Sequence, residues 1–197
     1  TDMKPAARII LASASPRRQQ LLEQIGITAI ARGVDLDETR KPGEPVAEYV
    51  NRLAMEKAQL GAELIDNTQS LPVLGSDTIV EIDGNVLGKP ENREAAKDML
   101  RLLSGKKHAV HTSVAIVTRD EILSDISRSI VEFKHLSEDE IERYVATGEA
   151  DDKAGSYAVQ GLAAQFIKNI NGSFSGIMGL PVYETVRLLK KCGVDPL

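Results

Sequence analysis

Two arginines follow a serine and a proline where a strand is predicted to turn into a helix. The sequence Ser-Ala-Ser-Pro-Arg-Arg, which ends in Arg17 and Arg18, comes directly after the apolar run at residues 9–12. Ser15 is a typical N-cap residue, and Pro16 suits the first helical position because its missing N–H has no partner there. A helix N-terminus favours anions, and guanidinium groups bind phosphate oxygens. The run therefore predicts a phosphate site, although a plain turn with solvated arginines is an equally open interpretation.

Asp77 is the first candidate for a general base or a metal ligand. It follows the buried run Val73-Leu74-Gly75, so we expect it at the carboxyl end of a strand, where open α/β sheets bind ligands. A carboxylate there can hold a divalent cation or orient a water molecule. Ser76 and Thr78 add hydroxyl groups beside it. The alternative interpretation is a loop aspartate that caps a local turn.

Several other polar residues could belong to the same site. Lys57 is expected on a long helix and Lys89 in a short loop after a hairpin, and either could be a solvated surface lysine. Glu38 lies in an acidic loop over residues 35–39 that could supply a metal ligand, although charge runs are more often solvated. Gln160 lies beside apparent core residues, where the backbone could satisfy its amide or the amide could read a base edge.

The elements that must position these residues alternate between strands and helices. Hydrophobic periodicity, caps and turn residues predict helices over residues 16–25, 45–65, 91–103, 137–147 and 181–191. Strands are predicted over residues 9–12, 29–31, 72–75, 79–82, 86–87, 108–118, 122–133, 155–161 and 166–170. This order indicates an α/β fold with a mixed, twisted sheet, flanking helices and two lobes around a central cleft. We expect residues 1–197 to form a single domain.

Composition excludes several classes of function. At 42% hydrophobic residues, the 197-residue chain can bury a sizeable core, and its net charge of −5 argues against broad nucleic-acid binding. The single cysteine, Cys192, rules out a disulfide within one chain and suits a reducing compartment. No apolar run approaches the roughly 20 residues of a membrane span. We therefore expect a cytoplasmic protein that binds neither nucleic acid nor membrane.

Six short motifs, in this order, resemble the Maf family of nucleotide pyrophosphatases. They are residues 11–18, Gly75-Ser76-Asp77-Thr78, Gly88-Lys89-Pro90, Asp152-Lys153-Ala154-Gly155 with Tyr157, Gln160-Gly161 and Gly179-Leu180-Pro181. The likeness extends from about Arg8 to Lys191. It implies an inosine-triphosphatase-like fold, often a homodimer, and hydrolysis of a nucleoside triphosphate to the monophosphate and pyrophosphate with a divalent cation.

The resemblance also implies a substrate. Arg17, Thr78 and Gln160 match the branch of the family that acts on dTTP and UTP. The branch that acts on 7-methyl-GTP has an aromatic residue, a Gln and a Glu at these positions. The expected substrate is therefore dTTP or UTP, with modified pyrimidine triphosphates as further candidates.

The mechanism expected from this likeness is attack of water on the α-phosphorus. Asp77 accepts the proton of that water, and Mg²⁺ or Mn²⁺ is held by phosphate oxygens and by Glu38 or Asp77. The cations expected to neutralise the triphosphate are Arg17, Arg18, Lys57 and Lys89. The groups expected to bind substrate or set specificity are Ser13, Arg17, Thr78 and Gln160. A non-catalytic nucleotide sensor that regulates cell division and a phosphatase remain alternatives.

Overall fold

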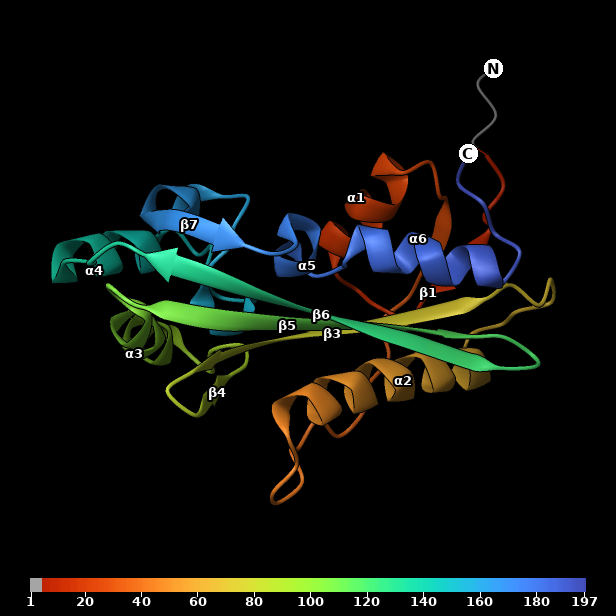
Figure 1. Ribbon diagram of the computed structural model, residues 1–197, viewed down its shortest axis with the longest axis horizontal. Helices are drawn as coiled ribbons and strands as arrows, with labels where there is room; N and C mark the ends of the chain where they lie inside the picture. The colour runs from red at the N-terminus through yellow and green to blue at the C-terminus, as the bar shows by residue number, and fades with distance from the viewer. Residues whose placement is uncertain (1–4) are drawn as a thin grey trace. The chain divides into compact units, whose positions relative to one another are not determined.

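The computed structural model describes residues 5–197, which form strands and helices in alternation (Figure 1). The strands are β1 (Ile9–Leu11), β2 (Ala29–Ala31), β3 (Val73–Ile82), β4 (Asn85–Leu87), β5 (Lys107–Val117), β6 (Ile122–Phe133) and β7 (Ile167–Asn171). The α-helices are α1 (Pro16–Gln24), α2 (Val46–Leu64), α3 (Arg93–Leu103), α4 (Glu138–Ala146), α5 (Phe174–Met178) and α6 (Val182–Lys191). Two 3₁₀ helices lie at Ala154–Ser156 and Leu162–Phe166. No helix in this described part of the chain is long and apolar enough to cross a membrane.

The strands form one mixed sheet in the order β2-β1-β3-β5-β6-β7, with β4 paired to β3. β1 is parallel to β2 and β3, whereas β4 and β7 are antiparallel to their partners. This arrangement confirms the predicted mixed sheet with flanking helices.

The described residues divide into two compact units. The first unit holds the described residues up to Asp77, together with Thr112–Ile126 and Gly179–Leu197. The second unit holds Thr78–His111 and Ser127–Met178. The long strands β3, β5 and β6 each contribute residues to both units. The single domain and the central cleft stay predictions.

In the first unit, Gly75 lets helix α2 lie directly on strand β3. A Cβ atom at Gly75 would lie 2.4 Å from the Ala54 carbonyl oxygen and 2.6 Å from the Ala58 nitrogen. Ala54 and Ala58 are fully buried and pack against Ala115. Figure 1 shows α2 on one side of the sheet, and α1 and α6 on the other. The close contact fixes the distance between side chains on α2 and side chains on β3.

The second unit has an aromatic core. Phe133 packs edge-to-face against Tyr157 and Phe166, and Tyr144 packs in the same way against Phe166. Nε2 of the buried His108 lies 2.6 Å from Oη of Tyr157. Burial lowers the pKa of His108 to about 4, so this imidazole is neutral at physiological pH. The core therefore anchors the segment that leads to Gln160.

Two predictions of local structure were wrong. Residues 155–161 do not form a strand, because Gly155 and Ser156 have φ angles of 70° and 68° and begin a turn. Asp77 does not follow the end of a strand but lies in the middle of β3. The parallel pairing of β3 with β1 ends at Leu74, and its antiparallel pairing with β4 begins at Val80. Asp77 therefore lies between the part of β3 that pairs with β1 and the part that pairs with β4. The polar residues Ser76 and Thr78 beside it suggest a strand end, but the strand continues through them.

Replacing Gly75 by alanine should lower the free energy of unfolding by about 1–3 kcal/mol. The new methyl group would meet backbone atoms of Ala54 and Ala58, which cannot move aside. Urea unfolding followed by circular dichroism measures this loss. Gly88→Ala is the matched control, because a Cβ atom there meets no atom within 4 Å. Equal losses in the two variants would contradict the packing described for α2 and β3.

Candidate active site

In the first unit, the ammonium group of Lys57 joins two carboxylates. Its Nζ lies 2.8 Å from Oδ1 of Asp77 and 2.9 Å from Oε1 of Glu38. Lys57 comes from α2, Asp77 from β3, and Glu38 from the loop between β2 and α2. Three residues singled out from the sequence are thus brought together by three separate segments of the chain.

Asp77 combines burial with an unused hydrogen-bonding oxygen. The residue is 7% exposed, and Oδ2 is buried without a hydrogen-bond partner among residues 5–197. Burial raises the pKa of this carboxyl group, the nearby charges of Lys57 and Arg18 oppose that rise, and Glu38 adds to it. A buried oxygen of this kind calls for a partner from outside the chain, such as a cation or a water molecule. The raised pKa also makes the carboxylate a better proton acceptor.

Arg18 is oriented by backbone and hydroxyl oxygens. Its Nε donates to the Gly179 carbonyl at 2.7 Å, and its Nη1 donates to Oγ of Ser13 at 3.3 Å. Burial lowers the pKa of Arg18 to about 10, and the charge of Asp77 opposes this effect, so the guanidinium stays positive at neutral pH. Oγ of Ser76 lies 3.0 Å from the same Gly179 carbonyl. The Gly179 carbonyl of the Gly-Leu-Pro motif therefore orients Arg18. Glycine suits this position because its φ is 126°.

The turn before α1 differs from the prediction in one respect. Ser15 occupies the N-cap position, but its side chain does not cap the helix, and its Oγ is buried without a partner among the described residues. The Ser15 backbone N–H instead donates to Oγ of Ser13 at 3.1 Å. Ser13 thus orders the turn and contacts Arg18. Arg17 is half-buried in the first turn of α1, and its charge lowers the pKa of Arg18.

The remaining predicted residues, Thr78, Lys89 and Gln160, belong to the second unit. Thr78 directly follows Asp77 in β3, and the side chains of Lys89 and Gln160 are exposed. The exposure of Gln160 corrects the expectation of a buried amide that needs partners in the core. It leaves the amide accessible to a ligand. The roles of these three residues in binding stay predictions.

Glu149 holds the loop that carries Gln160, and sequence reasoning missed it. Its Oε1 accepts a hydrogen bond from the Leu162 backbone N–H at 2.8 Å, and its Oε2 accepts one from Ala163 at 3.3 Å. A Cβ atom at Gly161 would lie 1.9 Å from Oε1 of Glu149. Gly161 is therefore required for this contact. No motif links an acid to amides 13 and 14 residues later, so only the folded structure shows the link.

The carboxylates around Lys57 suit a hard divalent cation that arrives with a phosphate ligand. Oδ2 of Asp77 is unpaired among residues 5–197, and the side chain of Glu38 is 55% exposed. Within the same residues, no group of three or more His, Cys, Asp or Glu side chains could hold a metal by itself. Mg²⁺ is usually bound by one or two carboxylates together with phosphates and water. The donor set fits that mode of binding.

Comparison with known proteins identifies the family. A family model described as Maf-like protein matches residues 8–192. This chain belongs to the Maf family. The resemblance found in the short motifs is therefore confirmed over nearly the whole chain.

Similar proteins carry related names. A protein of Aromatoleum aromaticum named dTTP/UTP pyrophosphatase is 48% identical over 97% of this chain and 98% of its own. A protein of Haemophilus ducreyi named nucleoside triphosphate pyrophosphatase is 43% identical over 96% of this chain and 98% of its own. The solved structure of the Staphylococcus aureus Ham1 protein aligns with 64% of this chain and 71% of that one, with a TM-score of 0.42 and 16% identity, too weak a likeness to carry an argument.

Replacing Lys57 by methionine should raise the pKa of Asp77. The attraction and the hydrogen bond that hold this pKa down are lost, while burial and the charge of Glu38 remain. The pH titration of the Asp77 carboxyl ¹³C signal measures the effect, with Asp77→Asn to assign the signal. Lys106→Met removes a surface lysine paired with Asp83 and should leave the signal unchanged. An unchanged or lower pKa in Lys57→Met would contradict the geometry described for Lys57.

Proposed function

We propose that this chain hydrolyses dTTP and UTP, and related modified pyrimidine triphosphates, to the monophosphate and pyrophosphate. The observation that carries the proposal is the contact of Lys57 with both Asp77 and Glu38 in a chain of the Maf family. The full-length similarity to proteins named dTTP/UTP pyrophosphatase supports this choice of substrate. The enzyme is thus a hydrolase that acts on acid anhydrides.

In the proposed mechanism, Asp77 takes the proton of the water that attacks the α-phosphorus. The bond from the α-phosphorus to the oxygen that bridges it to the β-phosphorus breaks, and pyrophosphate leaves with that oxygen. An ordinary aspartate, with a pKa of about 3.9, is a weak base at neutral pH. Burial raises the pKa of Asp77 and so reduces this mismatch, and its free Oδ2 provides the accepting atom. Lys57 holds Oδ1, which leaves Oδ2 to face the water.

Positive side chains neutralise the charge that develops on the phosphates. Arg18 is held in place by Gly179 and Ser13, so little reorganisation is needed when the triphosphate binds. We assign Arg17 and Lys89 to the same task. A divalent cation, Mg²⁺ or Mn²⁺, held by Glu38 and Asp77 would add positive charge and acidify a water molecule.

Specificity for the pyrimidine base is assigned to Arg17, Thr78 and Gln160, in line with the family branch that they match. The exposed amide of Gln160 offers an NH₂ donor group and a carbonyl acceptor to a base edge, and the Glu149 contacts fix the loop behind it. We further propose that the protein acts as a cytoplasmic homodimer.

Asp77→Asn should reduce pyrophosphate release by about 10²–10⁴-fold, because the proton acceptor is lost, while dTTP still binds. The assay measures pyrophosphate and orthophosphate from dTTP, UTP, dCTP and dGTP with Mg²⁺, with Mn²⁺ and with a chelator. Asp83→Asn is the matched control, because Asp83 lies in the β3–β4 turn with a φ of 49°, which asparagine adopts readily.

Normal turnover by Asp77→Asn would refute the assignment of the base. Orthophosphate as the first product would favour a phosphatase. A wild-type protein that binds dTTP without turnover would instead favour a nucleotide sensor.

A further inference from the structure

Glu38 reaches Lys57 from a stretch of chain that has no regular structure. Residues 32–45, between β2 and α2, form neither helix nor strand. Connections of this length are uncommon in compact folds, and those that stay ordered need specific contacts. The side chain of Glu38 is 55% exposed, so burial alone does not hold it. Something else must keep its carboxylate 2.9 Å from the Lys57 ammonium.

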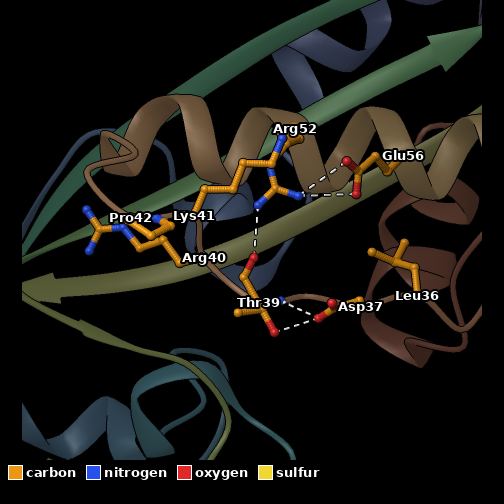
Figure 2. A pocket seen from close by; sticks show the side chains of 8 residues that line it. All are labelled: Leu36, Asp37, Thr39, Arg40, Lys41, Pro42, Arg52 and Glu56. Carbon is orange, nitrogen blue, oxygen red and sulfur yellow. Dashed lines mark hydrogen bonds and ion pairs between the residues drawn. The ribbon is translucent and has the colours of Figure 1, made fainter.

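Arg52 of α2 supplies the strongest of these contacts. Its Nε and Nη2 donate to the two carboxylate oxygens of Glu44 at 2.7 and 2.9 Å, a fork that binds the end of the loop. Nη2 also donates at 3.1 Å to the carbonyl of Thr39, the residue that follows Glu38 in the chain. Nη1 contacts both carboxylate oxygens of Glu56, one turn further along α2. Figure 2 shows the guanidinium between Thr39 and Glu56, beside a surface pocket of about 460 Å³.

Tyr49, one turn before Arg52 on α2, holds the neighbouring peptide. Its Oη donates a hydrogen bond to the carbonyl oxygen of Glu38 itself. The guanidinium of Arg52 lies over the Tyr49 ring, 5.5 Å from its centroid, so the two side chains support each other. Burial raises the pKa of Tyr49, which keeps its hydroxyl protonated as a donor.

Hydrogen bonds between residues of the loop itself also keep it ordered. Oδ1 of Asp37 accepts hydrogen bonds from the backbone N–H of Thr39 at 2.9 Å and from its hydroxyl at 2.6 Å, as Figure 2 shows. Arg40 donates to the carbonyl of Glu44 at 2.9 and 2.6 Å. The loop is thus folded on itself and fastened to α2 on both sides of the Glu38–Thr39 peptide.

We propose that Tyr49 and Arg52 are positioning residues for Glu38. By holding the carbonyl groups of Glu38 and Thr39 against α2, they place the Glu38 carboxylate at Lys57, which lies on the same helix. The link to catalysis rests on the proposed function, in which Glu38 helps to hold the divalent cation. The loop geometry itself rests on the contacts alone.

The first test measures the loop without reference to activity. Arg52→Lys keeps the charge but loses the fork, and Tyr49→Phe removes only the hydroxyl. Both variants should speed amide hydrogen exchange in residues 36–44 by about tenfold or more, with exchange in residues 73–82 unchanged. Arg101→Lys is the matched control, because Arg101 makes comparable contacts with Glu138 and Asp98 on the surface of the second unit. Unchanged exchange in residues 36–44 would overturn the positioning role.

The second test asks whether the effect passes through Glu38. We expect Arg52→Lys to raise the Mg²⁺ concentration for half-maximal pyrophosphate release by about 10–100-fold, as changes behind metal ligands commonly do. In a Glu38→Gln background, the same change should have no further effect. Equal effects in both backgrounds would overturn the proposal. If the wild-type protein releases no pyrophosphate, the proposed function fails, and the exchange measurement still decides the positioning role.

Discussion

The contact between Lys57 and Asp77 depends on how closely the backbone of α2 approaches β3. Gly75 lies two residues before Asp77 in β3. Its lack of a side chain, together with the small side chains of Ala54 and Ala58, lets α2 pack closely on the strand. Taking an ammonium and a carboxylate out of water costs free energy that their mutual attraction only partly returns. An ion pair in this position is therefore poor evidence for a purely stabilising role. It fits the proposed active site, in which one carboxylate oxygen of Asp77 is paired and the other is left for a ligand.

The groups around Asp77 are held mainly by neutral oxygens. Arg18 is fixed by a backbone carbonyl and a serine hydroxyl, and Glu38 by side chains that bind the peptide around it. The Arg18 guanidinium is therefore oriented by uncharged oxygens, and the Lys57 ammonium lies between the carboxylates of Asp77 and Glu38. Such charges are worth most to a polyanion when they are already oriented before it binds.

Much of this fold could be predicted from local signals. Hydrophobic periodicity placed α2, β5 and β6, and the capping box at Ser137 placed the start of α4, where the structure confirms it. The motif residues identified the family and the chemistry. Local signals failed at Asp77, where a polar sequence continues a strand, and at residues 155–161, where left-handed φ angles break one. The contacts of Arg52 with Glu44 and Thr39, and those of Glu149 with the Leu162 and Ala163 amides, could not be predicted, because they join residues 8 to 14 positions apart with no repeating pattern.

In the proposed mechanism, Asp77 faces the reacting end of a bound triphosphate. The most direct measurement is a crystal structure with Mg²⁺ and a dTTP analogue whose bridging oxygen between the α- and β-phosphorus is replaced by nitrogen. We predict Oδ2 of Asp77 within about 2.1 Å of the cation or about 2.8 Å of a water in line with the α-phosphorus. An Oδ2 that contacts neither, with the triphosphate bound away from Lys57 and Arg18, would contradict it.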